Sequence, residues 1–134
     1  MRASTTLGCS STALAHGLLT GAIGRNRTFT ADDWRSTSPM FAGATFEHYL
    51  DVVEELRRFA GERDHTVSQL AIAWTLRHPA VQVAIVGARH QSHIAESIEA
   101  LDLHVSDEEL AEIDRILGGA GAVAIGGPTP EAMP

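Results

Sequence analysis

The stretch that decides the fold is VQVAIVGARHQSHIAE, residues 81–96, in which an apolar run ends at a glycine and a helical pattern follows. Residues 81–86 are mostly apolar and β-branched, which is typical of a strand buried on both faces of a parallel sheet. Gly87 permits a tight turn after that strand. A short helix over residues 92–101 is expected from apolar side chains at helical spacing: Ile94, Ile98 and Leu101. The stretch therefore predicts an α/β fold.

Two amphipathic helices are predicted before this strand. Residues 46–60 place apolar side chains at steps of three and four, with charged side chains on the other face. Residues 67–77 form the second helix, and Thr66 with Gln69 matches a capping box, in which each side chain bonds the backbone N–H of the other residue. Trp74 lies on the apolar face of this second helix. We therefore expect Trp74 in the core.

The remaining segments give one more helix and two irregular regions. Ser106 and Glu109 form a second capping box, which predicts a helix ending near residue 117. Residues 14–24, LAHGLLTGAIG, are apolar between glycines and fit the end of a strand that turns into a loop. Residues 25–44 show neither helical nor strand periodicity. A loop of that length in a compact domain indicates either a functional segment or one whose packing partner is missing.

Composition excludes several classes of protein. The chain of 134 residues has a net charge of −7, which argues against a nucleic-acid surface, and no apolar stretch approaches the roughly 20 residues that span a bilayer. All positive side chains are arginine, so chemistry that needs a lysine within this chain is excluded. The single cysteine, Cys9, cannot form an internal disulfide, and no secretory signal is recognised. A cytoplasmic location is predicted.

The turn at Gly87 is the strongest candidate for a binding site. A glycine after a buried strand lets a ligand approach the backbone, and the next helix offers unpaired N–H groups to an anion. Arg89 adds a planar guanidinium that suits a phosphate monoester. The alternative is an ordinary turn with a solvated arginine. Glu96 is interpreted either as a hydrogen-bond acceptor for an adenine amino group or as a charge that favours the helix N-terminus.

Other candidate groups favour structural interpretations. His90 and His93 stand in the i, i+3 relation that directs two imidazoles to one metal ion, but no third ligand follows at a recognisable spacing, so we predict no metal site. The adjacent carboxylates Asp32 and Asp33 are interpreted as solvated loop residues rather than an acid–base pair. His16 lies in an apolar segment bounded by glycine, which leaves open that it faces a pocket.

Five segments together resemble the C-terminal portion of aldo-keto reductases: LAHGLLTG, TADDWRSTSPMFAG, TVSQLAIAWTLRHP, VAIVGARHQSHIAE and SDEELAEIDRIL. The resemblance covers residues 14–117, with residues 1–13 as a disordered start outside the family and residues 118–134 as a flexible Gly/Pro-rich tail. It implies a (β/α)8 barrel, of which this chain holds strands seven and eight with their helices. The expected product is therefore an incomplete barrel.

The resemblance also implies the cofactor and its contacts. Aldo-keto reductases use NADPH to reduce aldehydes and ketones to alcohols, and the arginine after strand eight pairs with the 2′-phosphate that NADH lacks. The family's catalytic Asp, Tyr, Lys and His belong to the first half of the barrel, so no catalytic residue is assigned here. The implied cofactor-binding residues are Leu14, Ala15, Gly17, Arg35, Gly87, Arg89, His93 and Glu96.

The function expected from these residues is the cofactor-binding portion of an NADPH-dependent reductase. We expect this portion to be inactive alone, with a small carbonyl compound as substrate of the complete enzyme and a complementary barrel fragment as a possible partner. Neither a nucleic acid nor a membrane is expected as a partner. Two alternatives stay open: a non-enzymatic module that binds NADP(H) or a protein, and the product of a truncated or frameshifted reading frame.

Overall fold

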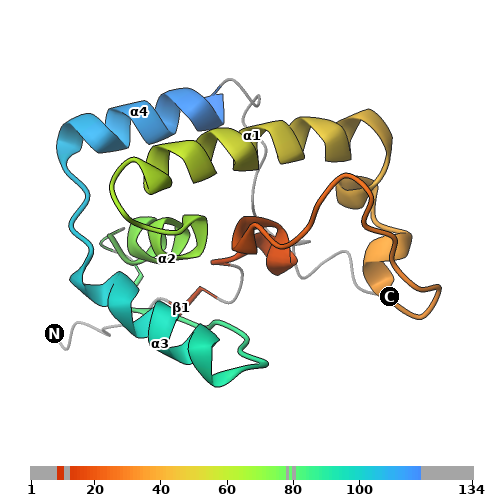
Figure 1. Ribbon diagram of the computed structural model, residues 1–134, viewed down its shortest axis with the longest axis horizontal. Helices are drawn as coiled ribbons and strands as arrows, with labels where there is room; N and C mark the ends of the chain where they lie inside the picture. The colour runs from red at the N-terminus through yellow and green to blue at the C-terminus, as the bar shows by residue number, and fades with distance from the viewer. Residues whose placement is uncertain (1–8, 11–12, 78, 80, 119–134) are drawn as a thin grey trace, which may run out of the picture.

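The computed structural model describes residues 9–10, 13–77, 79 and 81–118 of the chain. Figure 1 shows α4 (Asp107–Gly118) alongside α1 (Gly43–Gly61), with α2 (Val67–Arg77) below α1 and α3 (Gln91–Glu99) on the other side of α2. None of the helices in these ranges is long and apolar enough to cross a membrane. In chain order the elements are β1 (Cys9–Ser10), the 3-10 helices η1 (Ala15–Thr20), η2 (Trp34–Ser36) and η3 (Pro39–Phe41), α1 (Gly43–Gly61), α2 (Val67–Arg77), β2 (Val83–Ala84), α3 (Gln91–Glu99), η4 (Ala100–Asp102) and α4 (Asp107–Gly118).

The three long amphipathic helices form where the sequence predicts them, as α1, α2 and α4. Both capping boxes are confirmed by their hydrogen bonds. The Thr66 N–H donates to Gln69 Oε1 at 2.9 Å, and the Gln69 N–H donates to Thr66 Oγ1 at 3.2 Å. At α4 the Ser106 N–H donates to Glu109 Oε2 at 2.8 Å, and the Glu109 N–H donates to Ser106 Oγ at 3.2 Å. These bonds satisfy backbone donors that a helix start otherwise leaves unpaired.

The core lies between these helices and η1. One cluster joins η1 and η3 to the first half of α1, with Phe46, Leu50 and Val53 buried. A second cluster joins the last half of α1 to α2 and α4: Leu56, Phe59, Ala60, Val67, Leu70, Ile113 and Ile116. Because α1 contributes to both clusters, it is the element around which the other buried faces assemble.

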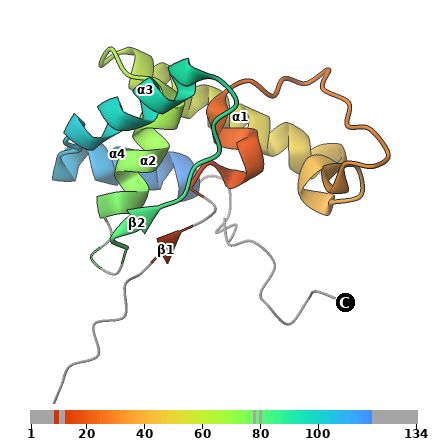
Figure 2. The ribbon, with the colours of Figure 1, turned by 90° about the horizontal axis from the view of Figure 1, so that it is seen from below.

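The sheet is shorter than the sequence predicts. Parallel strands β1 and β2 pair Cys9 with Val83 and Ser10 with Ala84, and Figure 2 shows them side by side below α2. The prediction of a strand over residues 81–86 buried on both faces is therefore wrong in length and in burial, since Val83 is 44% exposed and Ile85 is 56% exposed. In the described ranges β2 pairs only with β1, so its apolar side chains lack a second sheet neighbour.

Residues 14–20 are not the end of a strand, which corrects a second prediction. They form a turn and the 3-10 helix η1. Ala15, His16 and Gly17 have φ of 46°, 57° and 96°, a left-handed conformation that a strand cannot contain. The strand lies earlier in the chain, at Cys9–Ser10.

Helix α3 has the predicted position but leaves its apolar stripe exposed. Ile94, Ile98 and Leu101 are 52%, 58% and 63% exposed. Trp74 was expected in the core, and this expectation is wrong because its side chain is 38% exposed near the end of α2. The apolar face of α2 that is buried includes Val67, Leu70 and Ile72 instead. The side of the molecule formed by α3 and β2 is thus less completely covered than the side formed by α1 and α4.

The long loop after η1 contains short structured pieces. Within residues 25–44 the chain forms η2 and η3 and then begins α1 at Gly43. Phe41 is buried against Phe46, and Phe29 contacts Phe41 edge-on, so this loop is packed onto α1. Of the predicted disordered start at residues 1–13, Cys9–Ser10 form β1, and residues 1–8, 11 and 12 lie outside the described residues. Of the predicted tail at residues 118–134, Gly118 is the last residue of α4, and residues 119–134 lie outside the described residues.

Candidate functional site

An open groove brings together three separate parts of the chain. Its volume is about 540 Å³, and it lies between η1, the loop around η2 and the turn that precedes α3. The lining includes both arginines that the sequence resemblance singled out, together with a histidine, a tryptophan and two carboxylates: His16, Thr30, Asp32, Asp33, Trp34, Arg35 and Arg89. Arg35 and Arg89 are remote in the sequence, so only the tertiary fold places them on one groove.

Arg35 holds the loop around η2 against η1. Its Nη2 donates to Asp33 Oδ2 at 2.6 Å, and its Nη1 donates to the His16 carbonyl oxygen at 3.2 Å. The two side chains of the ion pair are only 19% and 23% exposed. The guanidinium also lies 4.5 Å from the centre of the Phe29 ring. With these contacts, Arg35 is mainly a structural member of the groove wall.

The two carboxylates of the groove are held in their ionised form. Hydrogen bonds from the Arg35 side chain and backbone lower the pKa of Asp33 to about 2. A hydrogen bond from Thr30 lowers the pKa of Asp32. A general acid needs a proton near neutral pH, and these carboxyl groups do not keep one. The pair therefore offers no general acid. Asp32 is exposed, as a solvated loop residue is expected to be, whereas Asp33 is partly buried and paired with Arg35.

Arg89 differs from Arg35 because its guanidinium is uncommitted. Within the described ranges it makes no ion pair and no hydrogen bond, and it is exposed at the groove edge. It directly precedes His90, the N-cap of α3, whose side chain forms no capping hydrogen bond. The first backbone N–H groups of α3 and a free guanidinium are thus close in the chain. This arrangement suits a phosphate group.

The turn at the start of η1 contributes His16 to the groove. Gly17 has φ of 96°, which favours glycine, and a Cβ at this position would lie 3.5 Å from Arg35 Nη1. The sequence placed Leu14 and Ala15 in the same segment, but Ala15 is only 1% exposed and packs in the core. Of this segment, His16 is the residue that lines the groove, and its ring meets Trp34 edge-on with centroids 4.8 Å apart.

Three other predicted cofactor contacts, Gly87, His93 and Glu96, do not line the groove. Gly87 is exposed, and a Cβ built there meets nothing within 4 Å. The His93 ring meets the His90 ring edge-on with centroids 5.2 Å apart, and the described residues contain no group of three side chains that could hold a metal ion. Glu96 accepts a hydrogen bond from Thr66 Oγ1 at 2.5 Å, so one of its oxygens is already bound to the start of α2. The other carboxylate oxygen of Glu96 has no hydrogen bond in the described ranges and could accept from an adenine amino group.

Sequence reasoning did not identify Thr30 and Trp34 as members of the groove. Neither residue belongs to a periodic pattern, since both lie in the loop of residues 25–44. The signal that was available is the length of that loop, because loops of this kind carry binding residues. Trp34 is 51% exposed, which is unusual for so large an apolar side chain and leaves its indole accessible to a ligand.

Comparisons with known proteins agree on one family. A model of the aldo/keto reductase family matches residues 9–118, so the match begins within β1 and ends with α4. The boundaries predicted for the family segment, residues 14 and 117, stay a prediction. The chain is similar to the solved structure of glycerol dehydrogenase AKR11B4 from Gluconobacter oxydans, with a TM-score of 0.81 and 33% identity over 92% of this chain and 37% of that one.

Curated relatives agree with this structural similarity. Aldo-keto reductase YhdN of Bacillus subtilis is 33% identical over 78% of this chain and 32% of its own length. Aldo-keto reductase yakc [NADP(+)] of Schizosaccharomyces pombe is 29% identical over 75% of this chain and 29% of its own length. The chain therefore spans about a third of the length of these relatives.

Proposed function

The chain belongs to the aldo/keto reductase family, and we propose that it is the NADP(H)-binding portion of an oxidoreductase that reduces aldehydes and ketones to alcohols. We propose further that β1 and β2 correspond to strands seven and eight of a (β/α)8 barrel. Their parallel pairing and the helices that follow them support this assignment. Binding is proposed for this chain, and reduction for the complete enzyme.

The observation that carries the proposal is the shared groove of Arg35 and Arg89. A dinucleotide has several phosphate groups, and it needs positive charge and backbone N–H donors at more than one point. Because Arg35 is paired with Asp33, its charge is largely balanced within the groove. Asp32 also lines the groove, so the two carboxylates balance the two arginines in total charge. Arg89 is the groove arginine without an ion-pair partner in the described ranges, and its guanidinium is therefore the one available to a phosphate.

Each part of the groove has a distinct role in this proposal. Arg89, after Gly87, holds the 2′-phosphate and so favours NADPH over NADH. The backbone of Leu14, Ala15 and Gly17 supports the pyrophosphate beside Arg35. His93 and Glu96 are assigned to the adenosine side, because His93 follows Arg89 within the first turn of α3 and Glu96 follows in the next turn. The carboxylate oxygen of Glu96 that Thr66 does not bond would accept from the adenine amino group.

The chemistry needs more than these residues. NADPH, when bound, supplies the hydride for carbonyl reduction, while a proton must come from an acid in the protein. The carboxyl groups in the groove are ionised, and the sequence contains no lysine. We propose that this chain alone binds the cofactor but does not reduce carbonyl compounds, and that a complementary barrel segment supplies the proton donor. A cytoplasmic location is part of the same proposal.

Titration of the 134-residue chain with NADPH and NADH tests the proposal, with nucleotide fluorescence as the measurement. Wild-type protein is expected to bind NADPH more tightly than NADH. Arg89→Ala should weaken NADPH binding about tenfold and leave NADH binding nearly unchanged, because charge-assisted bonds to one phosphate are lost. Arg115→Ala is the matched control, since Arg115 pairs with Glu112 on α4 and does not line the groove.

Equal NADPH affinity in wild type and Arg89→Ala would remove the proposed phosphate contact. A second measurement separates binding from catalysis: NADPH oxidation in the presence of aldehydes and ketones should stay at the background rate. NADPH should also raise the midpoint of thermal unfolding, because a ligand that binds only the native state stabilises it. Rapid carbonyl-dependent oxidation would contradict the proposed need for another segment.

A further inference from the structure

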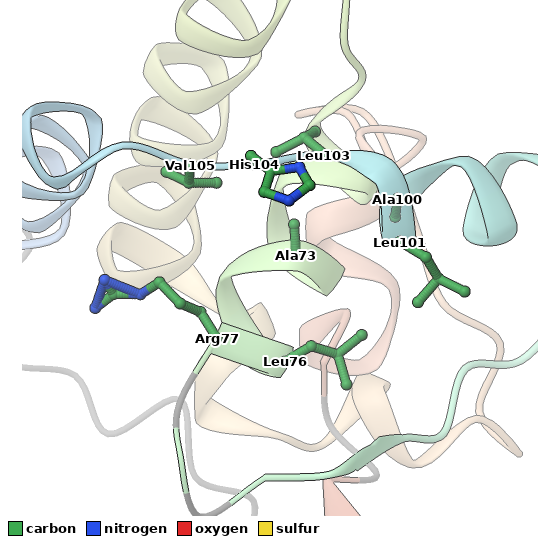
Figure 3. A pocket seen from close by; sticks show the side chains of 8 residues that line it. All are labelled: Ala73, Leu76, Arg77, Ala100, Leu101, Leu103, His104 and Val105. Carbon is green, nitrogen blue, oxygen red and sulfur yellow. The ribbon is translucent and has the colours of Figure 1, made fainter.

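A second pocket lies away from the cofactor groove, between the end of α2 and the segment that joins η4 to α4. Its volume is about 330 Å³. Figure 3 shows the side chains that line it, and none of them lines the groove of Arg35 and Arg89. Most of the lining is aliphatic: Ala73, Leu76, Ala100, Leu101, Leu103 and Val105, with Arg77 and His104 as the polar members.

The two ends of this pocket differ in chemistry. In Figure 3, Leu76 and Leu101 lie on one side of Ala73, and the guanidinium of Arg77 lies on the other side. Leu101 is 63% exposed, so the apolar end is open to a ligand. Arg77 makes no ion pair or hydrogen bond within the described ranges. An apolar end and an unpaired cation thus share one pocket.

His104 forms the wall between these ends. Its Nδ1 lies 3.0 Å from the carbonyl oxygen of Asp102, which fixes the ring beside the pocket. Asp102, the acidic residue next to this wall, is exposed and is not among the lining residues. Glu109, which lines an adjoining hollow with His104 and Val105, accepts a hydrogen bond from Arg63 Nε at 2.7 Å. Carboxylates near the pocket therefore leave Arg77 without a partner.

We propose that this pocket binds a medium-chain aliphatic carboxylate, with the hydrocarbon between Leu76 and Leu101 and the carboxylate on Arg77. Ligand sites typically combine a mainly apolar lining with a few polar groups that fix orientation. A guanidinium matches the two oxygens of a carboxylate through its fork of N–H donors. A purely apolar ligand would leave this fork unused. The proposal concerns a ligand in addition to NADP(H), and it does not depend on cofactor binding.

Isothermal titration of the full chain tests this proposal with hexanoate, octanoate and decanoate as probes. Octanoate is expected to bind about tenfold more tightly than hexanoate, because burial of each additional methylene is favourable by about 0.8 kcal/mol. Octanol, which has the same hydrocarbon without the charge, should bind at least about tenfold more weakly than octanoate. The control is Arg115→Gln, which changes an exposed arginine that does not line the pocket.

Two variants test whether octanoate binds in the pocket of Arg77 and Leu101. Arg77→Gln should remove the preference for octanoate over octanol and leave octanol binding unchanged. Leu101→Asp should abolish octanoate binding while NADPH affinity and the circular dichroism spectrum stay the same, since this side chain is exposed.

Arg77 also lies in the last turn of α2, where a cation compensates the helix dipole. If that is its whole role, Arg77→Gln lowers the unfolding midpoint and leaves the octanoate preference intact, which overturns the proposal. Equal octanoate binding in wild type and Leu101→Asp also overturns it, as does the absence of saturable binding. Loss of NADPH binding in Arg89→Ala, by contrast, leaves this outcome unaffected.

Discussion

Helices α4 and α3 carry apolar stripes of the same kind, and the fold treats the stripes differently. On α4 the stripe is 2% to 6% exposed: Leu110, Ile113 and Ile116. On α3 and the turn after it the stripe is 52% to 63% exposed: Ile94, Ile98 and Leu101. The difference teaches that an amphipathic pattern predicts a helix and identifies the face that can be buried. Whether another element covers that face depends on the tertiary structure.

The two stripes differ in exposure because α4 and α3 contact the rest of the fold in different ways. Helix α4 packs against α1, and Ile113 and Ile116 join the cluster that contains Leu56 and Phe59. Helix α3 contacts α2 through its other face, where Glu96 bonds Thr66 and Glu99 bonds Gln69. Polar bonds therefore attach α3 to the rest of the described fold, whereas apolar burial attaches α4.

The largest difference in the free energy of unfolding is expected between two variants that shorten one isoleucine of each stripe to alanine. Ile113→Ala should lower the free energy of unfolding by about 3 kcal/mol, because it removes a buried side chain and leaves a cavity. Ile98→Ala should change it by less than about 0.5 kcal/mol, because the side chain is already exposed. Urea unfolding followed by circular dichroism measures both values. Equal losses in the two variants would mean that the two stripes are equally covered.

A smaller difference in stability is expected when the N-terminal residues that precede α4 and α3 are replaced by alanine. Ser106→Ala should cost about 1 kcal/mol, because the Ser106 hydroxyl caps α4. His90→Ala should change stability by only a few tenths of a kcal/mol, because the His90 side chain makes no capping bond at α3. Thermal unfolding of the two variants gives the comparison, and Ser106→Thr should recover most of the loss. A similar cost at both positions would contradict the assigned caps.

The smallest effect is expected in the pH dependence of stability, to which Glu109 in the first turn of α4 contributes. Hydrogen bonds from the Ser106 backbone and then from Arg63 lower the pKa of Glu109 below its ordinary value of 4.5. Because the folded-state pKa is lower than the unfolded one, Glu109 stabilises the fold above pH 4.5 and this contribution is lost as the pH falls through the lowered value. Glu109→Gln should therefore show a shallower loss of stability in acid than wild type.

Unfolding free energies at neutral pH and at several values below pH 4.5 provide the measurement. Glu109→Gln keeps an oxygen that accepts from the Ser106 N–H, so the helix start is preserved while the charge is removed. Parallel curves for wild type and Glu109→Gln would show that the ionised carboxylate contributes nothing to the stability of α4.

The helices could be predicted because their signals are local. The spacing of Phe46, Leu50 and Val53 defines one face of α1, and the boxes at Thr66 and Ser106 mark the starts of α2 and α4. All these signals involve residues within a few positions of one another. Such short-range patterns need no knowledge of what the helix later contacts.

The strands and the turn before η1 could not be predicted in the same way. The run 81–86 has the composition of a buried strand, yet β2 covers only Val83–Ala84 because pairing depends on a second strand. The left-handed conformation of Ala15 and His16 is equally hidden in the sequence, since neither residue type favours positive φ strongly enough to signal it. Trp74 was assigned to the core from its spacing alone, without knowledge of its neighbours.

For the candidate site, the sequence indicated several of the residues, but only the structure showed which contacts these residues make. Gly87 and Arg89 were identified from the pattern of a strand, a glycine, an arginine and a helix, and Arg35 was identified through the resemblance. The pairing of Arg35 with Asp33 and the bond from Thr66 to Glu96 were not predicted. The sequence by itself determined the family, the long helices and their caps, because these depend on residue types at short, fixed spacings. Only the tertiary structure decided which apolar stripe is buried and which arginine stays free, because burial and charge pairing arise between residues that are distant in the chain.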